Sequence, residues 1–381
     1  MKNRKLLMIP GPTPVVRSIQ DQMGRETVAF GDPGFVGDFK SVLSDLKELF
    51  GTSGEVFVVA GTGTMAMEMA LANTLKAGDD LLVVSHGFFG DRFIDMAKRK
   101  GIRVDVLSYD WGKAPKVEEI EARLTEKTYK AVTVTHVDTS TGVAAPVKAI
   151  GKMLEKFPDT LYIVDGVAAT GGERVNIDEY NIDILFTGSQ KAFGVAPGLA
   201  ILWAGAKAMD RAKALEPIPE HYISFEKWLP IMHDTSKYYA TPAINMIWAL
   251  KESLSIMKAE GMENRYQRHE QNARAMQAAA EAMGFKLLAE EGARGVTLSC
   301  CLYPEGVDDA EFRRVLAEEG AMVAGGLAAY AGKLFRIGHM GNTDQHELLG
   351  AVAAIERTLH QAGLDVLGKG LTALQQELVR D

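Results

Sequence analysis

Two ionisable residues of this chain follow apolar runs, where a charged side chain has few partners. Lys191 comes after the mainly apolar run 182–186, and Asp165 comes directly after the run 160–164. Partial removal from water lowers the pKa of an amine and makes it a better nucleophile. A carboxylate in such a place needs a cation or several hydrogen-bond donors. We therefore expect Lys191 to react and Asp165 to pair with a cation, although a solvent-facing lysine and a helix-capping aspartate fit as well.

A glycine-rich turn lies at 60–66, Ala-Gly-Thr-Gly-Thr-Met-Ala, between an apolar run and a helical pattern. Backbone N–H groups and the positive end of a helix bind an anion at such a turn, with Thr62 and Thr64 as hydroxyl donors beside Gly63. The same stretch matches the G-x-G-x-x-A pattern of dinucleotide-binding folds. That interpretation requires an acidic residue about twenty positions later, and the run 80–87 ends instead in Ser-His-Gly. The turn therefore favours a single phosphate over a nicotinamide cofactor.

Three further groups would complete a site for a flat anionic ligand. Phe88 and Phe89 directly follow a strand pattern, and either would stack on a planar ring or fill the core. The stretch 135–142, Thr-His-Val-Asp-Thr-Ser-Thr-Gly, supplies hydroxyls, including Ser140, beside a carboxylate. Arg336 stands between Phe and Ile in a strand pattern, from which its guanidinium would fork onto a carboxylate.

Alternating apolar runs and helical patterns must position these residues. Buried-strand runs separated by amphipathic helices are typical of an α/β protein with a mainly parallel sheet covered on both faces. Ligands of such sheets bind at the carboxyl ends of the strands, which is where the polar residues above stand. The expected strands are 55–61, 80–87, 103–110, 129–138, 160–166 and 182–191, and the expected helices are 64–76, 89–101, 116–124 and 146–157.

The pattern changes in the last third of the chain, where the helical segments become longer. We expect a long connecting helix at 243–261, a second helix at 262–284 and then a smaller α+β part. This gives an N-terminal segment, 1–15, over the active site, a large domain, 16–245, and a C-terminal part, 246–381. The smaller part is expected to contain strands 295–303 and 333–341 and helices 308–320 and 343–363, followed by a tail of helical propensity.

Composition argues against several classes of function. The 381 residues carry a formal charge of −8, so the chain has no general attraction for nucleic acid or an anionic membrane. No apolar run approaches the roughly 18 residues of a membrane span, and the first residues lack a signal-peptide core. Cys300 and Cys301 are adjacent in a strand pattern and point to opposite faces, which fits two free thiols rather than a disulfide or a metal site. We expect a cytoplasmic protein without a bound metal.

Together these residues occur in motifs that resemble the class V, fold type I aminotransferases, which use pyridoxal 5'-phosphate, and in particular the alanine–glyoxylate and serine–pyruvate branch. The resemblance runs nearly from end to end, and its most specific part is the ordered set Asp165, Ser-Gln-Lys191 and Pro-Gly-Leu199. It implies a mainly parallel seven-stranded sheet sandwiched by helices, plus a smaller C-terminal α+β domain. The motifs that carry it are PGPTPV, AGTGTMAMEMAL, GFFGDR, THVDTSTG, VDGVAATGG, GSQKAFGVAPGLA, YYATPAINMIWALKESL and LFRIGHMGN.

The resemblance also implies a role for each matching position. Lys191 would bind the cofactor aldehyde covalently and move a proton, while Asp165 would pair with the protonated pyridine nitrogen. Phe89 would stack on the ring, where the family often has Trp, and Ser140 would lie near the ring hydroxyl or Asp165. The phosphate would be held by Thr62, Gly63, Thr64 and Gln190. The protein would be a homodimer with shared active sites, in which Tyr238 and Thr241 of the second subunit also reach the phosphate. The substrate would contact Arg336, Gly11 and Phe30.

The implied reaction is a ping-pong transfer of an amino group from a small amino acid, alanine or serine, to a 2-oxo acid, glyoxylate or pyruvate. The alternatives are another substrate such as an aminophosphonate or aspartate, a lyase like the cysteine desulfurases, and a non-catalytic subunit. A desulfurase has a histidine before the lysine and a cysteine in a late loop, whereas here Gln190 precedes Lys191 and 321–333 contains no cysteine. Asp138 stands where the family often has Glu, and VDGVAA replaces VDAVSS at 164–169; both differences bear on substrate preference.

Overall fold

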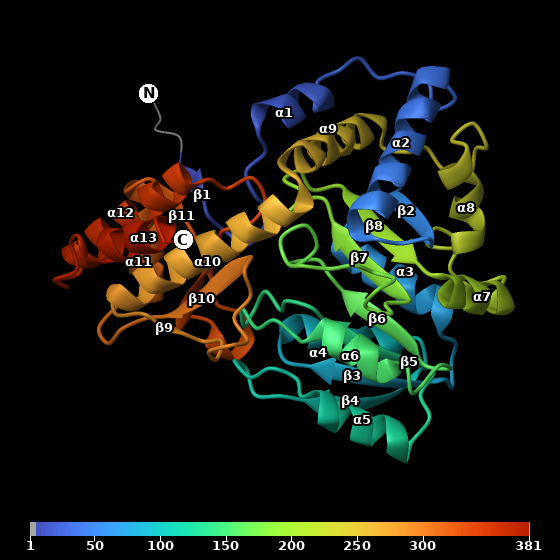
Figure 1. Cartoon of the computed structure of the whole chain (residues 1–381), viewed down its shortest axis with the longest axis horizontal. Coiled ribbons are helices and arrows are strands. Elements are labelled where there is room, and N and C mark those ends of the chain that lie inside the picture. The colour runs from blue at the N-terminus through green and yellow to red at the C-terminus, as the bar shows by residue number, and fades with distance from the viewer. Residues whose placement is uncertain (1–4, 381) are drawn as a thin grey trace.

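The computed structural model describes residues 5–380, which are built mainly around two sheets (Figure 1). The larger sheet has seven strands in the order β2 (Glu55–Ala60), β8 (Leu199–Ala204), β7 (Ile184–Gly188), β6 (Leu161–Asp165), β5 (Ala131–Thr135), β3 (Asp80–Ser85) and β4 (Arg103–Ser108). Strand β8 is antiparallel to both of its neighbours, and the other strands all run in one direction. The predicted mainly parallel, seven-stranded sheet is confirmed.

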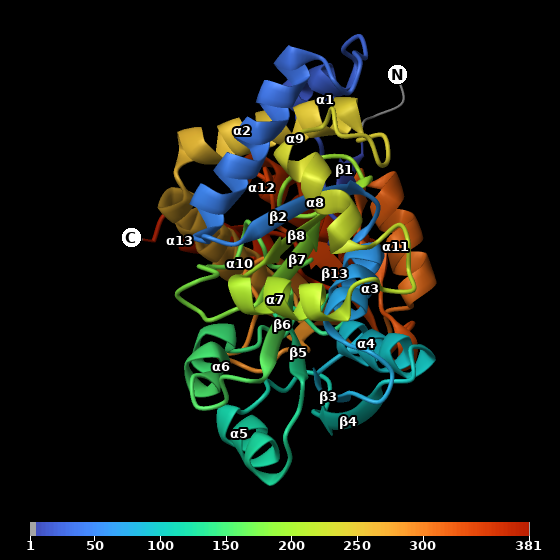
Figure 2. The same cartoon turned by 90° about the vertical axis from the view of Figure 1, so that its right-hand side faces the viewer.

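Helices flank this sheet, as the two perpendicular views show (Figures 1 and 2). Strands β5 to β8 are buried along their whole length, which explains why the sequence has continuous apolar runs there rather than alternation. The flanking helices are α2 (Pro33–Phe50), α3 (Gly63–Thr74), α4 (Phe88–Arg99), α5 (Val117–Glu126), α6 (Val147–Leu154), α7 (Ala206–Leu215) and α8 (Phe225–His233).

The parallel strands present their carboxyl ends at one edge of the sheet, and the predicted chemistry lies there. Asp165 is the last residue of β6, and Lys191 follows β7 by three residues. After β2 the chain turns into α3, and Thr62 caps that helix by accepting a hydrogen bond from the Met65 N–H at 3.4 Å. The sheet therefore brings together residues that are about 130 positions apart in the sequence.

A second, antiparallel sheet lies beside the first and carries Arg336. Helix α9 (Ile244–Glu260) packs on α2, and α10 (Met262–Ala282) starts after Gly261 and runs along the smaller sheet (Figure 1). The helices expected at 243–261 and 262–284 are thus confirmed. The strand order is β12 (Ala324–Gly325), β13 (Leu334–Gly338), β10 (Leu298–Leu302) and β9 (Lys286–Leu287), and the helices that complete this part are α11 (Asp309–Glu318), α12 (Gln345–Gln361) and α13 (Lys369–Leu378). The tail forms α13, which packs against α10 and α12.

The N-terminal segment is attached to the smaller sheet side of the molecule. Strand β1 (Leu6–Leu7) pairs in parallel with β11 (Ala321–Met322). The Gly338 N–H then donates to the Met8 carbonyl at 2.8 Å, which fixes the segment beside the end of β13. From there the chain passes toward Lys191. Residues 1–4 of the expected segment 1–15, and residue 381 of the C-terminal part, lie outside the described residues, and the domain boundaries stay a prediction.

Several helices were not anticipated from the sequence, although one of them has clear terminal signals. Asp32 accepts hydrogen bonds from the Gly34 and Phe35 N–H groups, Pro33 begins α2, and Gly51 ends it with φ 63°. An Asp N-cap followed by Pro, with glycine at the far end, is a recognised pattern of helix boundaries. Within residues 5–380, no capping side chain precedes helices α1 (Arg17–Met23), α7 and α8. Their weaker signals explain why they were missed.

Across the described residues, the cysteines and the absence of long apolar segments agree between sequence and fold. Cys300 and Cys301 are both buried and free in β10, as predicted. Within residues 5–380, no helix is long and apolar enough to cross a membrane.

Candidate active site

A cavity of about 190 Å³ opens at the carboxyl edge of the larger sheet. It contains seven of the residues that the sequence selected, which come from four separate strand ends and the helices that follow them. No group of three or more His, Cys, Asp or Glu side chains that could bind a metal occurs within the described part of the chain. The lining residues are Thr62, Gly63, Thr64, Met67, Phe89, Arg92, Thr135, Val137, Thr139, Asp165, Val167, Ala168, Gln190 and Lys191.

Lys191 lines this cavity beside the N-terminal segment and is only 8% exposed. The Thr13 hydroxyl donates to the Lys191 carbonyl at 2.8 Å, and the ammonium donates to the Pro10 carbonyl. Gly11, with φ +100°, passes so close that a Cβ there would lie 2.4 Å from Lys191 Cδ. Burial lowers the pKa of Lys191 to about 8, with a further lowering by Arg336 and an opposing effect of Asp165. The predicted partly desolvated amine is therefore present.

Asp165 lies deeper in the sheet and is 3% exposed. Its Oδ1 accepts a hydrogen bond from the Val167 N–H at 2.9 Å, which is the one hydrogen bond to this carboxylate among the described residues. Burial raises its pKa to about 7, and Asp138 raises it further, while the Val167 hydrogen bond and the charges of Lys191 and Arg92 act in the opposite direction. A buried carboxylate without a cation in contact is costly. It fits a ligand that brings its own protonated nitrogen.

The glycine-rich turn has the form of an anion site. Thr62 and Thr64 flank Gly63 at the N-terminus of α3, a helix of 12 residues, and all three line the cavity. A Cβ on Gly63 would lie 2.7 Å from Val167 Cγ2, so the backbone comes closer there than other residues allow. Arg92 was not selected from the sequence, yet its Nη1 donates to Thr64 Oγ1 at 2.8 Å and adds a positive charge. The turn therefore fits a phosphate.

Phe89 is held at its place by a carboxylate behind it. The fully buried Asp138 accepts the Phe89 N–H at 2.9 Å and the Gly90 N–H at 3.2 Å, which anchors the first turn of α4. The Arg92 guanidinium lies 4.8 Å from the centroid of the Phe89 ring. The signal for Arg92 was its spacing of three residues from Phe89, because residues i and i+3 share one face of a helix.

Ser140 does not line the cavity. Its hydroxyl donates to Asp138 Oδ1 at 2.6 Å and accepts the Phe88 N–H at 3.0 Å, so it supports the start of α4 from behind. Thr135 lines the cavity instead, beside Asp165 in the sheet register. Thr135 Oγ1 is buried and has no hydrogen-bond partner among the described residues. A hydroxyl or phenolate on a bound ring would satisfy it.

Arg336 approaches the site from β13 in the smaller sheet. Its Nε donates to the Gly325 carbonyl at 2.7 Å and its Nη1 to the Thr139 carbonyl at 3.3 Å. Within the described chain no partner is recorded for Nη2. Burial lowers the pKa of Arg336 from its ordinary value, although an arginine stays charged at neutral pH. Since Arg336 also influences the pKa of Lys191, a carboxylate bound by its free N–H groups would lie close to that amine.

Besides Ser140, Arg336 and Gly11, three more of the expected residues do not line this cavity: Phe30, Tyr238 and Thr241. Tyr238 is 64% exposed and packs against the Phe30 ring with centroids 5.2 Å apart. The Thr235 hydroxyl donates to the Phe30 carbonyl at 2.6 Å, and Thr241 is exposed nearby in the sequence. The structure of one chain thus gathers Phe30 and Tyr238 on the surface and does not bring Phe30, Tyr238 or Thr241 to its own Lys191.

Comparison with known proteins adds an independent result. The family model for class-V aminotransferases matches residues 36–342. An uncharacterized aminotransferase of Methanocaldococcus jannaschii is 37% identical over 99% of this chain and 98% of that protein. The serine–glyoxylate aminotransferase of Arabidopsis thaliana is 32% identical over 97% of this chain and 94% of that protein. The crystal structure of ureidoglycine–glyoxylate aminotransferase from Bacillus subtilis has a TM-score of 0.95 at 30% identity and covers 100% of this chain and 99% of that one.

Proposed function

This chain belongs to the class-V aminotransferases and is a pyridoxal 5'-phosphate-dependent transaminase of amino acids and 2-oxo acids, and from this premise we propose that it transfers the amino group of a small amino acid to glyoxylate by a ping-pong mechanism. The observation that carries the proposal is the buried Lys191 amine. It lines one cavity with Asp165, a carboxylate that has no cation in contact among residues 5–380, and the charge of Arg336, which has N–H groups without a partner in that range, also acts on it. Lys191, Asp165 and Arg336 thereby provide an amine, a partner for a cationic ring and a carboxylate clamp.

The cofactor, when bound, supplies an aldehyde and a ring that accepts electrons from the substrate Cα. The side chains and backbone of the protein orient the bound molecules and hold or move protons. Thr62, Gly63 and Thr64 offer hydroxyls and N–H groups to a phosphate, and Asp165 keeps a ring nitrogen protonated. Lys191, with a pKa of about 8, releases its proton readily enough near neutral pH to act as the base that moves a proton at the substrate Cα.

The size and lining of the site favour a small substrate. The cavity of about 190 Å³ must also admit the cofactor, and the side chains of Met67, Val167 and Ala168 make part of its wall apolar. Arg336 is the arginine placed to bind an α-carboxylate, and Arg92 is engaged with Thr64. Alanine and serine have short side chains without a second carboxylate, so they fit as donors. Two of the compared proteins carry glyoxylate in their names, which supports glyoxylate over pyruvate as the acceptor.

We also propose that two copies of the chain share their active sites. The exposed Tyr238 ring packs on the half-buried Phe30 ring, and Thr241 lies three residues from Tyr238. The pair would reach the neighbour's phosphate and substrate and would become buried there. An oligomer in solution, disrupted together with cofactor affinity by Tyr238→Ala, would support this arrangement. A cytoplasmic location stays a prediction from the sequence, tested by fractionation of the source cells.

Two alternative activities would each require a group that the site does not offer among the described residues. A transaminase of aspartate or an aminophosphonate needs a second cationic group at the substrate side chain, and Asp138 near the site argues against a further anion. A desulfurase needs a reactive thiolate. Burial raises the pKa of the Cys300 thiol well above its ordinary value, and Cys301 is buried in the same strand. Both cysteines are therefore unsuited to attack a substrate.

A half-reaction experiment tests the proposed function. Each amino acid is added alone to the holoenzyme while the visible absorbance of the cofactor bonded to Lys191 is followed. In a ping-pong mechanism the correct donor removes that absorbance without an acceptor, and glyoxylate then restores it. Alanine and serine should act and aspartate should not. Lys191→Ala should abolish turnover. Absorbance changes that require donor and acceptor together would contradict the ping-pong mechanism, and steady turnover by the Lys191 variant would contradict the site.

A further inference from the structure

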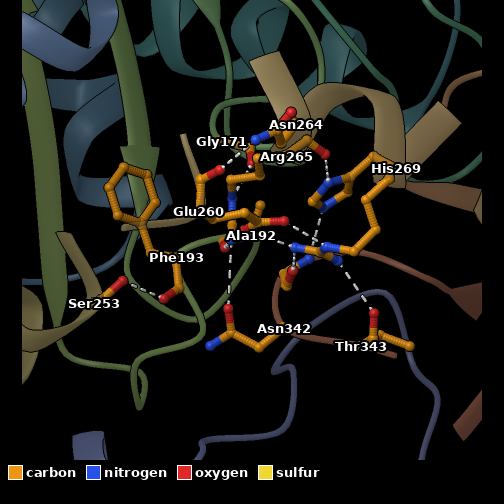
Figure 3. A network of polar contacts seen from close by, with 12 residues as sticks. Gly171, Ala192, Phe193, Ser253, Glu260, Asn264, Arg265, His269, Asn342 and Thr343 are labelled. Carbon is orange, nitrogen blue, oxygen red and sulfur yellow. Dashed lines mark hydrogen bonds and ion pairs between the residues drawn. The ribbon is translucent and has the colours of Figure 1, made fainter. Parts of the chain in front are cut away.

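A buried arginine outside the cavity joins the two loops that carry the reacting groups. Arg265, on α10, is 0% exposed. Its Nη2 donates to the Ala192 carbonyl at 2.6 Å and its Nε to the Gly171 carbonyl at 2.8 Å (Figure 3). Ala192 is the residue after Lys191, and Gly171 lies in the loop that follows Asp165. One guanidinium therefore holds the segment after each of these residues.

The turn after Lys191 is fixed by three different elements. The Lys191 carbonyl accepts from the Thr13 hydroxyl of the N-terminal segment at 2.8 Å. The Ala192 carbonyl accepts from Arg265 of α10, and the Phe193 carbonyl accepts from the Ser253 hydroxyl of α9 at 2.5 Å (Figure 3). Among these three, Arg265 contributes the charged donor, and charge-assisted hydrogen bonds are roughly twice as strong as neutral ones.

The same face of α10 also holds the segment that follows Arg336. His269 Nε2 accepts the Gly341 N–H at 2.9 Å, so its Nδ1 carries the proton toward the Arg265 carbonyl at 2.8 Å. Arg268 donates to the Gly341 carbonyl at 2.9 Å and to the Thr343 carbonyl at 3.1 Å. Strand β13, which carries Arg336, ends at Gly338, three residues before Gly341. The helix thus contacts the loops next to all three proposed reacting or binding groups.

The network has more arginines than carboxylates, so part of the positive charge is stabilised by backbone carbonyls. Arg265 and Arg268 share one carboxylate, Glu260, at 2.8 Å and 2.6 Å. Burial, followed by the charge of Arg268, lowers the pKa of Arg265 to about 10, so it remains protonated at neutral pH. Its Nε and Nη2 donate to the carbonyls of the two loops, and its Nη1 also donates to Asn342 Oδ1 at 3.5 Å. Because a buried guanidinium without partners is costly, displacement of either loop costs stability.

We propose that Arg265 is a positioning residue that sets the location of the Lys191 amine relative to Asp165 and Arg336. It does not line the cavity, and it acts through the Ala192 and Gly171 carbonyls. The inference rests on Lys191 being the reacting amine. Loss of the guanidinium removes the charged one of the three hydrogen bonds that hold the turn after Lys191. A misplacement of about 1 Å at a reacting group costs roughly 100-fold in rate.

Two substitutions and one control test this role. Arg265→Lys keeps the charge but cannot donate in three directions from a planar fork, and Arg265→Met removes every donor. Arg274→Met is the matched control, because Arg274 lies on the same helix, its side chain is 51% exposed, and its nearest acidic oxygen, on Glu377, is 3.9 Å away. We expect kcat per bound cofactor to fall about 10- to 100-fold in both Arg265 variants, with little change in the control.

Two readouts separate positioning from general stability. Hydrogen exchange of the protein without cofactor should become faster in peptides covering 189–197 and 339–343 in the Arg265 variants alone. The affinity for pyridoxal 5'-phosphate should change less than kcat, because the phosphate-binding turn at Thr62 is not contacted by Arg265. If Arg265→Met does not fold, the kinetics and hydrogen exchange of Arg265→Lys test the proposal. Wild-type kcat per bound cofactor and unchanged exchange in Arg265→Lys would overturn the proposal, as would a lower Tm with unchanged kinetics. Inactivity of the wild-type protein toward every amino acid would instead refute the proposed function.

Discussion

Gly11→Ala tests whether the N-terminal segment sets the position of the reacting amine. A Cβ at this position would lie 2.4 Å from Cδ, 2.7 Å from Cε and 2.8 Å from Nζ of Lys191. Ordinary contact begins near 3.4 Å, so the lysine side chain must retreat by about 1 Å, a displacement that costs roughly 100-fold in rate when it affects a reacting group. The substitution also places alanine at φ +100°, which costs about 1–2 kcal/mol of stability.

A second glycine separates the contact from the backbone strain. Gly320 has φ +102°, and a Cβ there would meet nothing within 4 Å. Gly320→Ala therefore carries similar backbone strain without touching Lys191. We expect both variants to lose a similar amount of unfolding free energy in urea, and Gly11→Ala alone to lose about 100-fold in kcat per bound cofactor. If kcat of Gly11→Ala stays within about twofold of that of Gly320→Ala, the segment does not constrain the amine and the reasoning is refuted.

Three further predictions follow from the titrating groups and the guanidinium of the site. Asp165→Asn should lower kcat at least about 100-fold, since it removes the group that keeps a ring nitrogen protonated; a rate within tenfold of wild type, in a variant with full cofactor occupancy, would contradict that role. Without cofactor, the wild-type protein should lose stability relative to Asp165→Asn as pH rises from about 4 to 7. The reason is that the native carboxyl, with its pKa raised to about 7, holds a proton that the unfolded chain has released. Urea unfolding at several pH values measures this difference, and a difference that is independent of pH would refute it. Arg336→Met should raise KM for both the amino acid and the 2-oxo acid about 10- to 100-fold, the loss expected for a charged hydrogen bond, and unchanged KM values in steady-state kinetics would exclude the carboxylate contact.

Much of the site could be predicted because it depends on local patterns at strand ends. Lys191, Asp165 and the turn at Thr62 each follow an apolar run, and parallel strands bring their carboxyl ends to one edge. The spacing of Arg92 from Phe89 places both on one face of α4. Arg92 was missed because its contact with Thr64 depends on how α4 packs against α3. Ser140 was expected near the ring hydroxyl or Asp165, and a tight turn at 138–142 directs its hydroxyl to Asp138.

Arg265 could not have been selected from the sequence, for a different physical reason. In the helix 262–282 it is one of several arginines, and it resembles the solvent-exposed ones in its charged surroundings. Its burial arises only when α10 packs against the turn after Lys191 and the loop after Asp165. Its partners there are the Ala192 and Gly171 carbonyls, and backbone carbonyls have no signature in the sequence. Long-range contacts to the main chain are thus the part of a site that sequence patterns leave open.

The site is arranged at a cost that binding of its cofactor offsets. Lys191 and Asp165 are both displaced by burial toward their neutral forms, with pKa values of about 8 and about 7. The amine donates to Pro10 rather than to Asp165. Both groups line the cavity, and no ion pair joins them within the described chain. A ligand that binds the amine and brings a cation to the carboxylate removes both penalties at once. Binding to the native state alone stabilises it by mass action, so the holoenzyme should unfold at a higher Tm than the protein without cofactor, and Asp165→Asn should reduce that gap.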